Sequence, residues 1–176
     1  NMTLREKYGE WGIILGATEG VGKAFCERLA KEGMNVVMVG RREEKLKELG
    51  EELKNTYEID YKVVKADFSL PDATDKIFAA TENLDMGFMA YVACLHSFGK
   101  IQDTPWEKHE AMINVNVVTF MKCFYHYMKI FAAQDRGAVI NVSSMTGISS
   151  SPWNGQYGAG KAFILKMTEA GACETE

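Results

Sequence analysis

The sequence lacks any long apolar run, and this absence bears on membranes and secretion. Its early hydrophobic stretch extends only from Ile13 to Leu15. A membrane-spanning helix needs about 20 apolar residues, and a signal peptide needs an apolar stretch of about 7–15. We therefore expect neither of these, no membrane partner, and a cytoplasmic protein.

Clustered positive charge is also absent. The formal net charge is −4, and lysine and arginine form no stripe along the chain. Proteins that bind nucleic acid usually carry such a stripe, because they must neutralise phosphates. The sequence therefore predicts no nucleic-acid partner.

Metal-ligand and disulfide patterns are missing as well. The cysteines are widely separated and never form a CxxC pair: Cys26, Cys94, Cys123 and Cys173. Because they lie among apolar residues, we expect buried, reduced thiols. His109 and His126 lack the HExxH spacing of zinc enzymes, so we expect no metal site.

What the sequence does contain is an alternation of short apolar runs and amphipathic segments. Its 176 residues, 47% of them hydrophobic, suffice for one domain with a core. We expect strands at 11–16, 35–39, 61–66, 88–93 and 138–142 and helices at 21–31, 72–80, 106–133 and from about 157, with a further helix striped by Leu46, Leu49 and Leu53. This alternation predicts an α/β fold, a doubly wound parallel sheet.

A glycine-rich loop joins the first predicted strand to the first predicted helix. Its glycines let the backbone turn tightly, approach a pyrophosphate and pack helix against strand. The helix N-terminus offers free N–H groups to phosphate oxygens. Any tight turn can use glycine, but the position after the first strand favours a dinucleotide site. The predicted cofactor contacts in this loop are Gly16, Thr18, Glu19, Gly20, Val21 and Gly22.

The end of the second predicted strand indicates which dinucleotide binds. An acidic residue there would hydrogen-bond the free ribose 2′-hydroxyl of NAD, whereas this chain has Arg41 and Arg42. Guanidinium groups pair with phosphate in a charge-assisted, bidentate way, which favours NADP(H). The alternative is a solvated helix start, although cations there would oppose the helix dipole. Thr18 is a plausible second contact to the same phosphate.

Tyr157 and Lys161 lie four residues apart, on one face of the last predicted helix. We expect the nearby ammonium to lower the Tyr157 pKa from its ordinary value of about 10 and so to make this phenol a general acid/base. Ser144 ends the fifth predicted strand at the same edge of the sheet, where its hydroxyl can hold the reacting oxygen. The neighbouring Ser143 is an alternative for that role.

These motifs, in this order, resemble the short-chain dehydrogenase/reductase family over the whole chain. Both G-x-x-x-G-x-G and S-x-x-G-x(9)-Y-x-x-x-K match, and the second pattern selects Ser144 over Ser143. The resemblance implies a Rossmann-like, NADP(H)-dependent oxidoreductase in which residues 1–176 form a single dinucleotide-binding and catalytic domain. The implied catalytic residues are Ser144, Tyr157, Lys161 and Asn116, and the further cofactor contacts are Asp67, Phe68, Ala93, Tyr157 and Lys161.

Two of these implied roles have simpler alternatives. In the family an Asp at the position of Asp67 hydrogen-bonds the adenine amino group, but this residue could instead cap the following turn. Asn116 falls where the family has a helix-kinking Asn, whose side chain binds the backbone or a water in a proton relay toward Lys161. It could also be an ordinary polar residue within a helix.

The sequence also departs from the family pattern. Leu15 replaces a Thr before the glycine loop, and the segment from Ala93 to His96 replaces Asn-Asn-Ala-Gly. The lost amides would steady the strand end, and we expect His96 to supply replacement hydrogen bonds. Residues 168–176 still read as helix without a stop signal, so we expect the family's further strands and substrate-covering loop to be missing from this chain.

Three longer stretches, 9–46, 91–120 and 143–163, resemble a branch of the family in gut bacteria that interconverts 7-oxo bile acids and their 7β-hydroxy epimers. This implies a bile-acid or steroid substrate that lies against Trp153, Ile148 and Leu95, although Trp153 could equally belong to the core. The family's usual dimer helices are present, so we expect a homodimer. The alternatives are a reductase for another steroid or small ketone and a catalytically idle NADP-binding scaffold.

Overall fold

The computed structural model describes residues 2–149 and 151–175. Within them a five-stranded parallel sheet has the order β3-β2-β1-β4-β5. The strands are β1 (Trp11–Leu15), β2 (Asn35–Gly40), β3 (Tyr61–Lys65), β4 (Met86–Tyr91) and β5 (Ala138–Asn141). The helices are α1 (Leu4–Tyr8), α2 (Gly20–Lys31), α3 (Glu43–Tyr57), α4 (Ala73–Thr81), α5 (Trp106–Ile113), α6 (Phe120–Ala133) and α7 (Gly155–Glu174). The predicted doubly wound α/β fold is confirmed.

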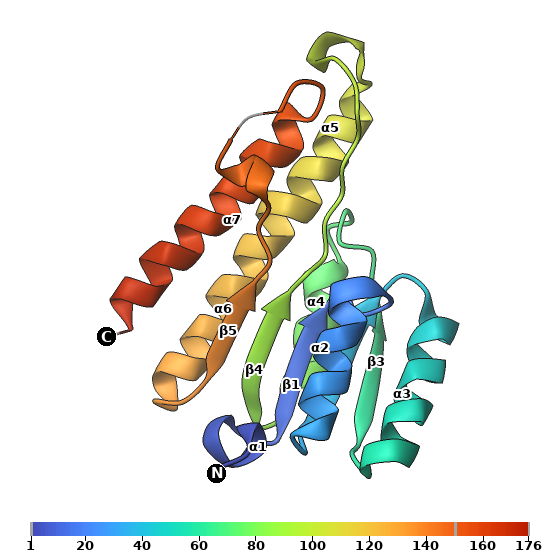
Figure 1. Cartoon of the computed structure of the whole chain (residues 1–176), viewed down its shortest axis with the longest axis vertical. Helices are drawn as coiled ribbons and strands as arrows, with labels where there is room; N and C mark the ends of the chain where they lie inside the picture. The colour runs from blue at the N-terminus through green and yellow to red at the C-terminus, as the bar shows by residue number, and fades with distance from the viewer. Residues whose placement is uncertain (1, 150, 176) are drawn as a thin grey trace.

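Helices cover both faces of the sheet (Figure 1). On one face α2 and α3 bury Leu29, Leu46 and Leu53 against the strands. On the other face α4, α6 and α7 bury Ile77, Phe120 and other apolar side chains. All six residues of β2 are buried, as expected of a parallel strand that is covered on both sides. No helix of the described residues is long and apolar enough to cross a membrane.

The predicted long helix from 106 to 133 is present but interrupted. The segment η2 (Asn114–Thr119) is a turn of π-helix between α5 and α6. Such bulges re-aim side chains and recur at functional sites. In this chain the bulge carries Asn116, which is 1% exposed.

Some element boundaries differ from the prediction. β4 spans Met86–Tyr91 rather than 88–93, because after Tyr91 the backbone leaves the sheet. Helix α1 was not predicted, although its N-terminus carries a capping box in which Thr3 and Glu6 bond each other's backbone N–H. That T-x-x-E pattern is the signal that could have revealed the helix.

Candidate active site

The predicted site residues follow the carboxyl ends of all five parallel strands. The order in which the strands are added to the sheet reverses between β1 and β4. From β1 the chain passes through α2 to β2 and then to β3 on one side, and α4 then carries it back to β4 on the other side of β1. Ligands of open α/β sheets bind at this switch point. The glycine loop lies directly beside it, after β1.

The glycine loop is packed too closely for side chains at two positions. Gly16 has φ +101°, a backbone conformation that favours glycine, and a Cβ there would lie 2.6 Å from the Ala93 nitrogen. A Cβ on Gly22 would lie 1.8 Å from the Gly16 oxygen. Glu19 at the N-cap makes no side-chain cap hydrogen bond in the described chain. The first N–H groups of α2 therefore remain available to a phosphate.

A cavity of about 310 Å³ opens beside this loop. Most of the predicted cofactor contacts line it, namely Gly16, Thr18, Glu19, Arg41, Arg42, Asp67, Phe68 and Ala93. Its glycine floor and two arginines suit a phosphorylated dinucleotide, so the residues present fit NADP(H). Gly20, Val21 and Gly22 belong to the loop and the first turn of α2 rather than to the cavity lining.

Charged groups at the cavity pair with one another. Arg42 forms a 2.9 Å ion pair with Glu19, which lowers the Glu19 pKa. Glu19 therefore holds a predicted phosphate-binding arginine at the rim. Burial of Asp67 favours a higher pKa, but hydrogen bonds from Ser69 and the nearby Arg41 outweigh burial and lower it. Asp67 thus caps the turn that follows it, by accepting hydrogen bonds from the backbone and side chain of Ser69.

The two candidate serines are distinguished by their hydrogen bonds. Ser143 Oγ donates to the backbone oxygen of Lys161 at 2.7 Å, so its proton is occupied within the fold. Ser144 Oγ accepts from the backbone nitrogen of Thr146 at 3.2 Å and from its hydroxyl at 2.9 Å. The Ser144 proton therefore remains free to donate, which agrees with the selection of Ser144.

Lys161 is buried below Tyr157. Its side chain is 1% exposed, and Nζ donates to the Val142 oxygen at 2.7 Å. The ammonium lies 5.7 Å from the centre of the Tyr157 ring. Burial lowers the Lys161 pKa, because a charged ammonium loses its water contacts.

The expected lowering of the Tyr157 pKa by Lys161 is wrong for the chain alone. Burial raises the pKa of this phenol, the Cys94 thiol raises it further, and only the Ser144 hydroxyl lowers it. The Lys161 ammonium is committed to the Val142 oxygen instead of the phenol oxygen. In the chain alone, burial therefore favours the neutral phenol of Tyr157.

Exposed apolar side chains lie on the loops that follow β4 and β5. Trp153 is 63% exposed and has φ +60°, so it is not a core residue. The loops that carry these side chains are joined, since the Gly99 nitrogen donates to the Trp153 oxygen at 2.9 Å. The exposed apolar rim, as we name it, consists of Phe98, Ile101, Met145, Ile148 and Trp153.

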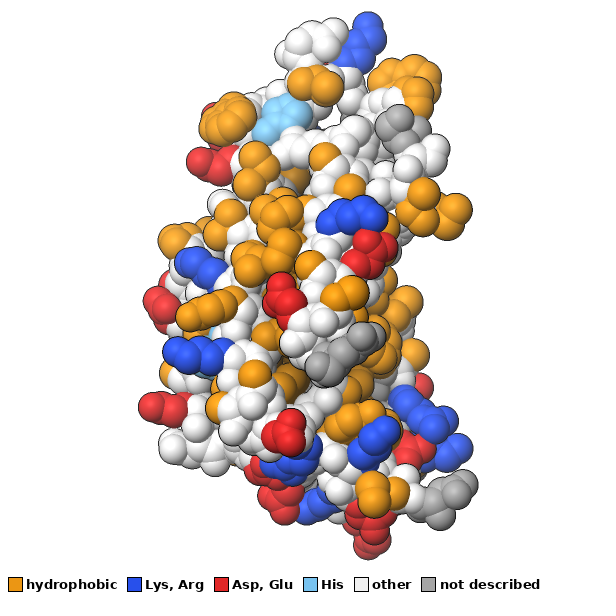
Figure 2. Space-filling view, turned by 90° about the vertical axis from the view of Figure 1, so that its left-hand side faces the viewer, with side chains coloured by type: hydrophobic (Ala, Val, Ile, Leu, Met, Phe, Trp, Pro, Cys, Tyr) orange, Lys and Arg blue, Asp and Glu red, His pale blue; other side chains and the backbone are white. Residues whose placement is uncertain are grey.

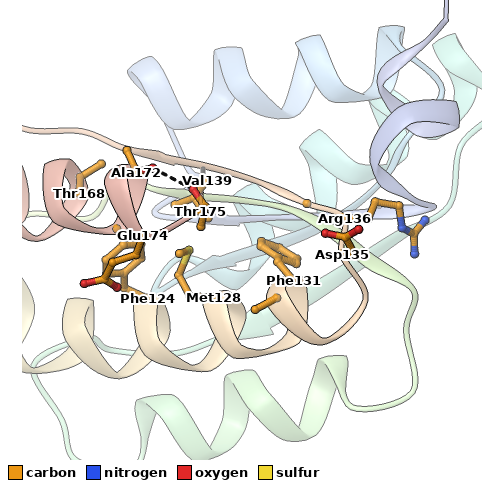
Figure 3. Close-up of a pocket in the computed structure, with 13 residues that line it drawn as sticks. Phe124, Met128, Phe131, Asp135, Arg136, Val139, Thr168, Ala172, Glu174 and Thr175 are labelled. Carbon is orange, nitrogen blue, oxygen red and sulfur yellow. Dashed lines mark hydrogen bonds between the residues drawn. The ribbon is translucent and has the colours of Figure 1, made fainter.

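A larger cavity lies away from these residues. It measures about 590 Å³ and is bounded by α6, α7 and the start of β5 (Figure 3). Phe124, Met128 and Phe131 contribute apolar surface, and Thr168 and Thr175 face them from α7 and its end. Because it lies at the amino end of β5, whereas the predicted site lies at the carboxyl edge, it takes no part in the site.

The sequence profile described as short chain dehydrogenase matches residues 10–176. The chain belongs to the short-chain dehydrogenase family. It is 99% identical over 175 residues to a 7beta-hydroxysteroid dehydrogenase of Mediterraneibacter gnavus and 82% identical to one of Collinsella aerofaciens, covering 99% of this chain and 66% of each relative. A structure from a study of 7beta-hydroxysteroid dehydrogenase stereoselectivity matches with TM-score 0.98 and 82% identity over 99% of this chain and 68% of that one. This chain thus spans just under two thirds of its curated relatives' length.

Asn116 holds the segment after β4, where the sequence departs from the short-chain dehydrogenase pattern. Its Oδ1 accepts from the Leu95 nitrogen at 3.0 Å, and its Nδ2 donates to the Leu95 oxygen at 2.7 Å. The amide thus binds the chain as a neighbouring strand would, and the π-helical turn aims it there. The expectation that His96 supplies these bonds is wrong, since its ring packs edge-on against Tyr157 and Phe98.

The prediction of buried thiols holds for only two cysteines. All four are free; Cys26 and Cys123 are buried, but Cys94 and Cys173 are exposed. Cys94 follows β4 where the backbone has left the sheet, and it lines the cavity beside the glycine loop. Local apolar composition could not reveal this, because exposure there depends on where the strand ends.

Proposed function

We propose that the full-length protein carrying this sequence interconverts a 7-oxo bile acid and its 7β-hydroxy epimer with NADP(H). The observation that carries the oxidoreductase assignment is the convergence of Ser144 and Lys161 on Tyr157 at the carboxyl edge of the sheet, beside the glycine-lined cavity. Similarity to two 7beta-hydroxysteroid dehydrogenases supports the substrate. In this proposal residues 1–176 form one dinucleotide-binding and catalytic domain.

The glycine loop and the two arginines would hold the cofactor. The N–H groups at the start of α2 would bind the pyrophosphate, Arg41 and Arg42 would pair with the 2′-phosphate, and Asp67 would bind the adenosine part. Thr18, Glu19, Phe68 and Ala93 complete the walls. When bound, NADP(H) supplies or accepts the hydride at substrate carbon 7.

Proton movement belongs to the chain's own residues. In the reducing direction Tyr157 Oη gives its proton to the carbonyl oxygen as that oxygen gains negative charge, and in the oxidising direction the phenolate takes it back. Ser144 donates its free proton to the same oxygen and stabilises the charge. Lys161 provides a buried positive charge below the phenol, and Asn116 holds the Leu95 backbone beside the site.

The exposed apolar rim fits the proposed substrate class. A steroid is a flat apolar body, and burying it against Ile148, Trp153 and Phe98 would be favourable by about 25 cal/mol for each Å² removed from water. Small ketones would gain little from so wide a rim. This favours a steroid over a small substrate.

The deciding experiment follows NADPH oxidation by the full-length protein with a 7-oxo bile acid and identifies the product epimer by chromatography. We expect a 7β-hydroxy product. A small ketone and a steroid ketone with its carbonyl elsewhere serve as controls. Reduction of either control without the bile acid would move the assignment to that substrate, and NADPH binding without any turnover would indicate an idle scaffold.

We further propose that two copies pair through α6 and α7 and that the protein works in the cytoplasm. Hydrophobic side chains gather over the face that α6 and α7 present (Figure 2), and Met121, Tyr125, Met128 and Met167 border a groove between these helices. Light scattering of the full-length protein should give the mass of a dimer, and a monomer at micromolar concentration would contradict this. The free thiols suit a reducing compartment.

A further inference from the structure

The hydroxyl of Ser144 is held by one neighbouring residue. A serine hydroxyl has one proton and two lone pairs. Both hydrogen bonds that Ser144 Oγ accepts come from Thr146, one from its backbone nitrogen at 3.2 Å and one from its hydroxyl at 2.9 Å. With two donors aimed at the oxygen, the Ser144 proton must point away from Thr146. The oxygen can therefore act toward a substrate as a donor and not as an acceptor.

Thr146 is itself fixed against the helix that carries Tyr157. It is the central residue of the short 3₁₀ turn η3 (Met145–Gly147). A Cβ on Gly158, the residue after Tyr157, would lie 2.7 Å from the Thr146 oxygen. A Cβ on Gly147 would lie 2.9 Å from the Ala162 nitrogen, one residue after Lys161. The turn therefore contacts α7 beside both residues of the Tyr-Lys pair.

The side chains of Ser143 and Met145, on either side of Ser144, do not donate a hydrogen bond to Ser144 Oγ. Ser143 donates to the Lys161 oxygen and stabilises the backbone of α7. Met145 is 76% exposed. Among the side chains of the described residues, only Thr146 donates a hydrogen bond to Ser144 Oγ.

We propose that Thr146 is a positioning residue, whose hydroxyl holds Ser144 as a hydrogen-bond donor toward the reacting oxygen. The inference rests on the proposed function. It goes beyond the S-x-x-G pattern, which leaves the position of Thr146 open. Without this hydroxyl, Ser144 Oγ keeps only the backbone donor, and the side chain can rotate or turn a lone pair toward the substrate. The preorganised donor then weakens, and reorienting it adds to the barrier.

The test compares Thr146→Val and Thr146→Ser in the full-length protein, alone and combined with Ser144→Ala. Losing one neutral hydrogen bond should lower kcat by about three- to tenfold in Thr146→Val, and Thr146→Ser should restore it. The KM and affinity for NADPH should not change. In the Ser144→Ala background Thr146→Val should have no further effect, because the group it positions is absent.

A matched control is Thr168→Val, which removes a hydroxyl elsewhere on α7 that donates to the Ile164 oxygen and accepts from Asn141 Nδ2, without contacting Ser144 Oγ. It should change the melting temperature but not kcat. If Thr146→Val does not fold, Thr146→Ala carries the same comparison with less apolar volume beside Ser144. An unchanged kcat, or an equal loss with and without the Ser144 hydroxyl, would overturn the proposal.

The substrate assignment is tested separately from this inference. Wild-type protein that fails to reduce a 7-oxo bile acid contradicts the proposed function, whereas the ratio of variant to wild type can be measured on any ketone that the wild type reduces. A protein that reduces no ketone would overturn both. The two proposals can therefore fail separately. The substrate assignment depends on wild-type activity with a 7-oxo bile acid, and the role of Thr146 depends on the ratio of variant to wild-type kcat.

Discussion

Replacing Tyr157 with phenylalanine should remove turnover while leaving NADPH binding intact. The substitution deletes one oxygen and its proton and keeps the ring that packs against His96. Proton transfer by a positioned side chain contributes about 10²- to 10⁴-fold to a rate, so kcat should fall by that factor. Steady-state kinetics gives kcat, and the quenching or enhancement of NADPH fluorescence gives the affinity.

The matched control is Tyr57→Phe, at the end of α3 and far along the chain from Ser144, Tyr157 and Lys161. It should retain wild-type kcat. In the alcohol-oxidising direction the wild-type rate should rise with pH, because only the phenolate accepts a proton and burial holds the Tyr157 pKa above its ordinary value. Substantial turnover by Tyr157→Phe would eliminate this phenol as the acid/base.

The second large effect concerns cofactor choice. Replacing Arg41 or Arg42 with alanine should weaken NADPH while leaving NADH binding nearly unchanged. Each charge-assisted hydrogen bond to the 2′-phosphate is worth about 1.5–3 kcal/mol, so the Kd for NADPH should rise by about 10- to 100-fold per arginine. Titration of each variant with both cofactors, followed by fluorescence, measures the difference.

The expected loss cannot be attributed to weakening of α3. Arg42 lies at the N-cap of that helix, where a positive charge opposes the dipole, so removing it should not destabilise the helix. Arg28→Ala is the control, because Arg28 pairs with Glu32 on the outer surface of α2. Equal weakening of NADH and NADPH would show that the arginines do not read the 2′-phosphate.

Structural features that depend on residues close together in the chain were predictable from the sequence. The stripe of Leu46, Leu49 and Leu53 follows helical periodicity, and all three are buried in α3. The glycine loop was predictable for a similar reason. Gly22 meets the Gly16 oxygen across a single tight turn, so the contact that requires this glycine is local in the chain, whereas Gly16 also lies against Ala93 after β4.

The environment of the site was less predictable, because it depends on residues that are distant in sequence. The Tyr157 pKa rises because α7 is packed into the fold and Cys94 approaches from the loop after β4. The strand end is held by Asn116, which only a π-helical turn brings to Leu95. No local pattern encodes either contact.

By itself, the sequence determined the parallel α/β fold and the residue types of the site, because periodicity, glycine turns and the Tyr-Lys spacing act over a few residues. Only the tertiary structure decided which serine keeps a free proton, what holds Lys161, and which apolar side chains stay exposed on the loops after β4 and β5. Hydrogen-bond partners and burial are set by segments that meet across the sheet edge. Where those segments meet is fixed by the packing of the whole chain.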